Sequence, residues 1–149
     1  MKVYIGADHA GFDLKEAVMA HLSKMHYDVE DAGDKQLDPN DDYPHFAYTV
    51  TTKVLGDEDD DARGILLCGS GQGMCIAANR VRGIRASLCW NKEVARETRN
   101  DNDSNVLCIP ARLLSEEESL AIIDTWLTMP FSGASRHLRR IHEIEELYG

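Results

Sequence analysis

The sequence of 149 residues has no run of about eighteen apolar residues, the length that a membrane-spanning helix requires. Its first residues, MKVYIGAD, read as the start of a strand and lack the apolar core of a secretory signal. The four cysteines show no paired spacing typical of a metal site and lie within apolar segments, as reduced thiols of an intracellular protein do. We therefore expect a soluble, cytoplasmic protein without a metal or another cofactor.

Positive charge is scarce, since 16 Lys and Arg face 26 Asp and Glu for a formal net charge of −10. Nucleic acids and anionic membranes bind concentrated basic surfaces, so neither is an expected partner. Two acidic segments, 57–61 (DEDDD) and 116–118, are interpreted as a solvated loop and as the start of a helix. Basic residues concentrate at 136–140 (RHLRR), and this contrast favours a small anionic ligand.

Short apolar and β-branched segments alternate with helical patterns along the chain. The strand-like segments are VYIGA (3–7), DVEDAG (28–33), GILLC (64–68), IRASLC (84–89) and NVLCIP (105–110). This alternation predicts an α/β protein with a parallel sheet covered on both faces. No linker or repeat divides the chain, so we expect one domain over residues 1–149. In such a sheet the ligand binds beyond the carboxyl ends of the strands.

The strongest local signal is residues 65–79, ILLCGSGQGMCIAAN, a buried strand followed by a glycine-rich turn and a helix. Gly69, Gly71 and Gly73 alternate with Ser70 and Gln72, which lets the backbone approach a ligand and direct several N–H groups at an anion. The spacing matches neither the dinucleotide fingerprint nor the phosphate-binding P-loop. The alternative interpretation is a turn without a ligand.

Cys68 occupies the last position of that strand, beside a helix N-terminus. Such a setting lowers the pKa of a thiol and stabilises the thiolate, which predicts a reactive cysteine. The alternative is a buried packing residue, the role expected for Cys75, Cys89 and Cys108.

Charged side chains at two further places could meet the same ligand. Asp8 and His9 follow the first strand and therefore lie at the sheet edge where Cys68 lies; the alternative is that Asp8 caps a helix and His9 is merely exposed. Arg136 and Arg140 are four residues apart on one face of the last helix, where together they could hold a phosphate.

Six segments together closely resemble the ribose-5-phosphate isomerase B family: IGADHAGFDLK, DYPHFA, ILLCGSGQGMCIAANR, GIRASLC, NDSNVL and RHLRR. They occur in order over nearly the whole chain. The resemblance implies a three-layer α/β/α Rossmann-like domain with a five-stranded parallel sheet. It also implies interconversion of a phosphorylated aldose and ketose without a cofactor, by a homodimer or dimer of dimers with shared active sites.

The resemblance also assigns roles to individual residues. It implies that Cys68 is the catalytic base, that Ser70 lies beside the thiol, and that the amides of Gly69 to Gly73 hold an enediolate. Relatives that use a glutamate as base carry it where this chain has Met74. The remaining implied substrate-binding residues are Asp8 for sugar hydroxyls, His9, Arg112, Arg136 and Arg140 for phosphate, and Tyr43 and Asn102 for the sugar.

One position departs from the family pattern. Members that act on cyclic ribose 5-phosphate carry a ring-opening histidine immediately before the Asn-Asp of the NDxNVL segment, where this chain has Asp101. Three hypotheses follow. The first is isomerisation of ribose 5-phosphate aided by Asp101 or water; the second is the same chemistry on a four-carbon sugar phosphate, which cannot close a five-membered ring; the third is a sugar-phosphate-binding module without catalysis.

Overall fold

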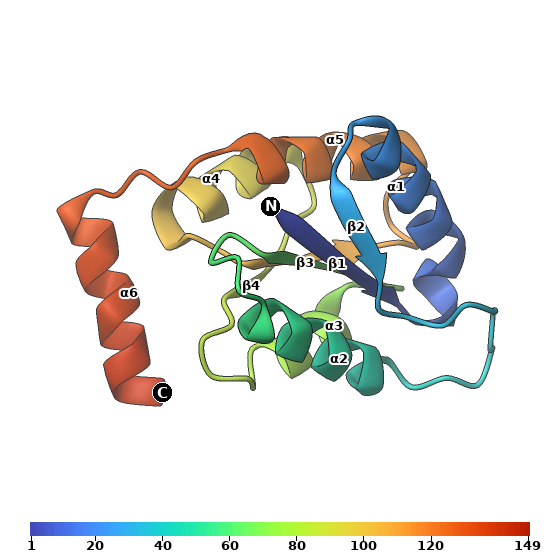
Figure 1. Ribbon diagram of the computed structural model, residues 1–149, viewed down its shortest axis with the longest axis horizontal. Coiled ribbons are helices and arrows are strands. Elements are labelled where there is room, and N and C mark those ends of the chain that lie inside the picture. Colours follow the sequence, from blue (N-terminus) through green and yellow to red (C-terminus); the bar gives the residue numbers. More distant parts are fainter.

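A computed structural model describes all 149 residues and contains one parallel sheet of five strands (Figure 1). The strands are β1 (Lys2–Ala7), β2 (Asp28–Asp31), β3 (Arg63–Cys68), β4 (Ala86–Leu88) and β5 (Val106–Pro110). Their order across the sheet is β2-β1-β3-β5-β4, and every neighbouring pair is parallel. The predicted α/β class is confirmed, and each strand lies within its predicted segment or extends it by one residue.

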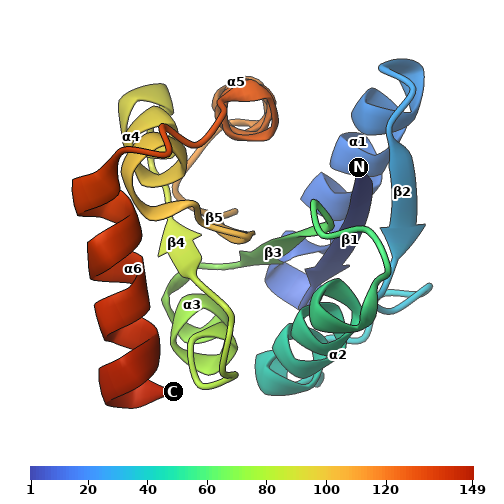
Figure 2. The ribbon, with the colours of Figure 1, turned by 60° about the vertical axis from the view of Figure 1, so that its left-hand side comes forward.

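Helices cover both faces of the sheet. They are α1 (Phe12–Lys24), α2 (Tyr43–Gly56), α3 (Gln72–Ala78), α4 (Lys92–Asn102), α5 (Glu116–Thr128) and α6 (Ser135–Tyr148), with a short 3₁₀ turn, η1 (His9–Gly11), before α1. Figure 2 shows α1, α4 and α5 on one side of the sheet and α2 and α3 on the other. None of the six helices is long and apolar enough to cross a membrane.

Each face has its own apolar core. On one face, Val18 and Leu22 of α1 pack with Trp126 of α5. On the other, Val50 of α2 packs with Met74 of α3. The three central strands are buried on both faces, which explains why their sequences read as continuous apolar runs.

A buried ion pair joins α1 to the end of β2. The Lys15 side chain is 0% exposed, and its Nζ lies 3.0 Å from both carboxylate oxygens of Asp31. It also donates to the carbonyl of Asp34. A charge this deeply buried is stable only when it is paired, so Asp31 holds Lys15 in the core.

Helix α6 lies outside the three layers, next to α4 and the β4 edge (Figures 1 and 2). Within α6 only His137 is buried. Four apolar side chains of this helix are exposed: Leu138, Ile144, Leu147 and Tyr148. The helix therefore presents an apolar surface that its own chain does not cover.

Candidate active site

The candidate site lies at the carboxyl ends of β1 and β3, which are neighbours at the centre of the sheet. The chain runs outward from β1 to β2 and then returns across the sheet to β3, so the strand order reverses between these two strands. In doubly wound sheets ligands bind at this reversal. Asp8 follows β1 and Cys68 ends β3, which confirms that both residues lie at one edge.

The glycine-rich segment after Cys68 forms a tight turn into α3. Gly71 has a φ of 75°, in the left-handed region that favours glycine, and a Cβ atom there would lie 2.4 Å from Leu88 Cδ1. The exposed Ser70 accepts a hydrogen bond from the Gln72 N–H through its hydroxyl at 3.3 Å. The hydroxyl thus supports the turn, and its predicted role beside the thiol stays a prediction.

The Cys68 side chain is buried, with the residue 4% exposed. Burial raises the pKa of the Cys68 thiol, and the negative charge of Asp8 acts in the same direction. Hydrogen bonds from the backbone N–H groups of Met74, Gly71 and Gly73 oppose this rise without cancelling it. The predicted lowering of the Cys68 pKa is therefore wrong for the resting protein, because desolvation outweighs the amides.

The thiol with a lowered pKa is that of Cys75. The pKa of Cys75 falls to about 7, mainly because the Cys108 side chain hydrogen-bonds to it. Cys75 is half-buried on α3, and the Asn79 amide donates to its sulfur at 3.6 Å. Cys89 and Cys108 are buried, as expected of packing residues. Cys75 therefore differs from the inert packing residue that the sequence predicts.

Asp8 has the capping role that was the alternative interpretation, and it also faces the site. Its Oδ1 accepts the N–H groups of Ala10 at 2.9 Å and Gly11 at 3.3 Å, which stabilises η1. Its charge still acts on Cys68. A cap and a ligand contact are compatible, because a carboxylate has two oxygens.

His9 is held by a residue that the sequence did not single out. The Nδ1 atom of His9 lies 2.8 Å from Asp41 Oδ1, and the backbone N–H of His9 donates to the same oxygen at 3.1 Å. Asp8, His9 and Asp41 each bring one potential metal-ligand atom within 4.8 Å of the others. The His9–Asp41 contact itself accounts for the closeness of two of these atoms, and we assign no metal to the cluster.

Two further predicted substrate-binding residues lie against the glycine-rich turn. A Cβ atom on Gly73 would lie 2.5 Å from Cζ of Tyr43, so the tyrosine ring rests on the glycine. A Cβ atom on Gly69 would lie 3.1 Å from Nη1 of Arg112, which shows that the guanidinium lies over that residue. The glycines thus give the two side chains room at the same edge as Cys68.

The other predicted residues lie elsewhere in the chain. Asp101 and Asn102 end α4, just before β5 begins, and thus lie at the amino edge of the sheet, opposite Cys68. Arg136 and Arg140 are exposed on α6, which lies at the opposite end of the molecule from α1, the helix that follows Asp8 and η1 (Figure 1). Within one chain these four residues do not join the site.

Asp101 is accompanied by a buried histidine. The Nε2 atom of His137 lies 3.6 Å from Asp101 Oδ1, and the amide of Asn100 donates to the same oxygen at 2.7 Å. The Asp101 side chain is 48% exposed, so it remains accessible from outside the chain.

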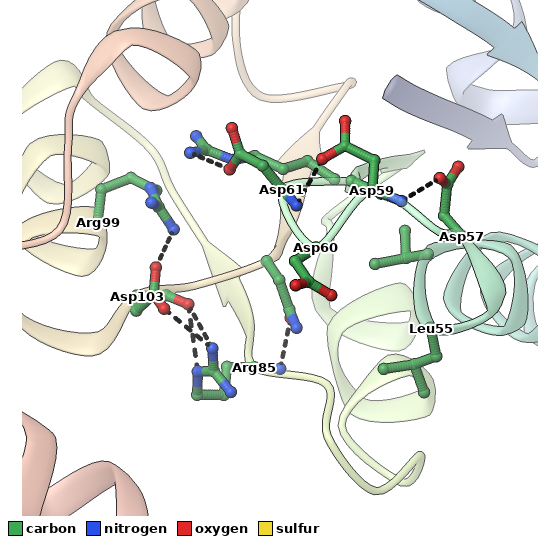
Figure 3. A pocket seen from close by; sticks show the side chains of 12 residues that line it. Leu55, Asp57, Asp59, Asp60, Asp61, Arg85, Arg99 and Asp103 are labelled. Atoms are coloured by element: carbon green, nitrogen blue, oxygen red, sulfur yellow. Dashed lines mark hydrogen bonds and ion pairs between the residues drawn. The ribbon is translucent and has the colours of Figure 1, made fainter. Parts of the chain in front are cut away.

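A cavity of about 190 Å³ also lies at the amino edge (Figure 3). Its charged walls pair with one another: Arg99 contacts Asp103 at 2.9 Å, and Arg63 contacts Asp61 at 3.0 Å. The acidic segment 57–61 forms the loop that the sequence predicted between a helix and a strand. Because the three arginines that line it are all paired with aspartates of the cavity, it offers no free cation to a phosphate and does not compete with the Cys68 edge as a site.

The comparison with known proteins agrees with this geometry. A sequence profile of the family described as Ribose/Galactose Isomerase matches residues 3–144. This chain belongs to the ribose/galactose isomerase family. The Escherichia coli K12 protein named ribose-5-phosphate isomerase B is 41% identical, over 96% of this chain and 93% of that protein.

Two solved structures from this family are closely similar. The ribose 5-phosphate isomerase from Thermotoga maritima is 46% identical, with a TM-score of 0.92 and 98% of each chain covered. The Mycoplasma genitalium ribose-5-phosphate isomerase B, solved with bound ribulose-5-phosphate, is 39% identical, with a TM-score of 0.93 over 97% of this chain and 94% of that one. The expected family and its α/β/α fold are confirmed.

Proposed function

We propose that this ribose/galactose isomerase family member interconverts ribose 5-phosphate and ribulose 5-phosphate without a metal. The observation that carries the proposal is the juxtaposition of Cys68 with the backbone N–H groups of Gly71, Gly73 and Met74. An isomerase of this kind needs a base for the proton on the carbon next to the carbonyl, and donors for the enediolate that results. The names of relatives 41% and 46% identical support this substrate.

In the proposed mechanism the Cys68 thiolate removes that proton and returns it to the neighbouring carbon. The amides of the glycine-rich turn stabilise the negative oxygen while the proton is on sulfur. Asp8 binds sugar hydroxyls, Tyr43 lines the sugar site and Ser70 lies beside the base. Because burial raises the Cys68 pKa, only a minor fraction of the free enzyme carries the thiolate at neutral pH.

The phosphate is proposed to bind at His9, Arg112, Arg136 and Arg140. Since the last two lie on α6, away from their own Cys68, a second copy of the chain must supply them, together with Asp101 and Asn102. The exposed apolar residues of α6 support such a contact between copies. We therefore propose a homodimer, or a dimer of dimers, with shared active sites.

Replacing Cys68 by Ala tests the chemistry. The thiolate acts in the transition state, so Cys68→Ala should reduce kcat by about a hundredfold or more while the Kd for inorganic phosphate stays within about twofold of wild type. The matched control is Cys75→Ser, which removes the more acidic thiol. A Cys68→Ala enzyme with normal turnover would refute the assignment.

Mixing two inactive variants tests the shared site. Cys68→Ala lacks only the base, and the double variant Arg136→Ala, Arg140→Ala lacks only the phosphate arginines. After equal amounts exchange subunits, half of the dimers are mixed, and each contains one intact site, so activity should recover to about a quarter of wild type. Failure of any recovery, with mixed dimers demonstrated by mass spectrometry, would show that one chain forms the complete site.

The four-carbon substrate remains a second candidate because of one observation, Asp101. A carboxylate stands in the position of the family's ring-opening histidine, and a tetrose phosphate needs no ring opening. Measuring ketose formation from four- and five-carbon aldose phosphates on one preparation decides between the two substrates.

We also propose a cytoplasmic location, supported by the four free cysteines.

A further inference from the structure

Asp41 lies in the loop between β2 and α2 and reaches back to the turn after β1. Its side chain is 7% exposed, although the loop around it is largely exposed. One oxygen, Oδ1, accepts from both the backbone N–H and the ring Nδ1 of His9. The His9 side chain is 34% exposed, so one side of the imidazole is buried on Asp41 and the other remains accessible.

This contact determines how the imidazole can meet a ligand. When Nδ1–H is donated to the carboxylate, Nε2 is the ring nitrogen left for a ligand. A ring with a proton on both nitrogens then donates one to Asp41 and the other outward. The two bonds to one oxygen also fix the ring relative to its own backbone.

We propose that Asp41 is a positioning residue that orients His9 and keeps its Nε2–H directed at the substrate phosphate. This inference rests on the phosphate-binding role proposed above for His9. A carboxylate near a phosphate repels it unless a cation lies between them, and the His9 ring is the group that Asp41 contacts. The pair presents one donor and no net charge to the phosphate when the ring is protonated.

The substitution Asp41→Asn tests the proposal, because it keeps the shape of the side chain and removes its charge. The Ki of inorganic phosphate and the KM for ribose 5-phosphate should both rise about tenfold, as expected when a charge-assisted hydrogen bond is lost, while kcat changes by less than about threefold. The matched control is Asp42→Asn, which removes the same charge one residue later from an exposed side chain without a capping bond. In that control the Ki should stay within about twofold of wild type.

A double-mutant cycle separates positioning from a general structural role. In a His9→Ala background, Asp41→Asn should no longer raise the phosphate Ki and should leave it unchanged or lower it, because the residue through which Asp41 acts is gone and only its repulsive charge is removed. Equal effects of Asp41→Asn with and without His9, or an unchanged Ki in the single variant, would overturn the inference.

A measurement on the wild-type protein covers the case in which the variant does not fold. In ¹⁵N NMR spectra with inorganic phosphate bound, His9 should carry a proton on both Nδ1 and Nε2; a ring protonated on only one nitrogen would overturn the inference. Phosphate binding is measurable without turnover, so the two proposals fail separately. Wild type inactive on ribose 5-phosphate contradicts the proposed function, whereas an active wild type with an unaffected Asp41→Asn variant contradicts the role of Asp41 alone.

Discussion

The contact between Gly73 and Tyr43 allows a substitution that disturbs the sugar site while preserving the fold. Gly73 is the second residue of α3, and a Cβ atom there would meet Cζ of Tyr43 at 2.5 Å and two other ring atoms within 2.9 Å. The ring is the movable partner, since Tyr43 is 40% exposed and can turn toward solvent. Gly73→Ala should therefore displace Tyr43 from the glycine-rich turn and leave the turn in place.

Two opposing effects determine how much Gly73→Ala changes the free energy of unfolding. Alanine stabilises a helix over glycine by about 1 kcal/mol, whereas forcing the ring aside costs about 1–3 kcal/mol. The free energy of unfolding should thus fall by no more than about 2 kcal/mol, measured by urea denaturation. If Tyr43 contributes one ordinary hydrogen bond to the substrate, KM for ribose 5-phosphate should rise about two- to tenfold.

The decisive comparison uses a variant from which the Tyr43 ring has already been removed. In a Tyr43→Ala background, Gly73→Ala has nothing to displace, so KM should not change further and the protein should gain stability, by up to about 1 kcal/mol. A folded Gly73→Ala enzyme with wild-type KM would refute the placement of Tyr43 in the site. A double variant with a higher KM than Tyr43→Ala would show that the glycine acts by some other route.

Three other outcomes are expected. Because the Cys68 pKa is raised, the thiolate fraction and kcat/KM should climb about tenfold per pH unit from pH 7 to 8.5 in a Cys75→Ser background; a level profile would contradict a buried thiol base. Asp101→His should increase kcat/KM for ribose 5-phosphate and leave a tetrose phosphate unaffected, and no gain on the pentose would mean that Asp101 already opens the ring. Asp31→Ala should lower the free energy of unfolding by about 3–5 kcal/mol, because it leaves the buried charge of Lys15 with only the exposed carboxylate of Glu16 at 3.8 Å; thermal and urea denaturation measure this, and a loss under about 1 kcal/mol would contradict it.

The sequence predicted the sheet well because its central strands are buried on both faces and read as unbroken apolar runs. The prediction was less accurate for the two edge strands, β4 and β2. The fourth strand was expected from residue 84 to 89 but spans Ala86–Leu88, because the Arg85 N–H bonds to the side chain of Asn105 and not to a neighbouring strand. The second strand was expected to reach residue 33 and ends at Asp31, whose carboxylate turns to Lys15.

The candidate site was predictable where it depends on strand order and unpredictable where it depends on packing. Asp8 and Cys68 could be placed together because each lies at the carboxyl end of a parallel strand. Asp41 could not be found, since it lies in a loop with several other acidic residues, and only its burial against His9 distinguishes it. The direction of the Cys68 pKa also depends on the depth of burial, which local sequence does not reveal.

The position of α6 makes the proposed activity depend on how much of the protein is present. If the arginines of this helix complete the site of a second copy, as proposed above, a lone molecule would hold two halves of different sites and complete neither. At concentrations well below the dissociation constant of the dimer, turnover would scale with the square of the protein concentration. At a low concentration of the protein there would then be almost no isomerase activity, and doubling that concentration would quadruple the rate of turnover.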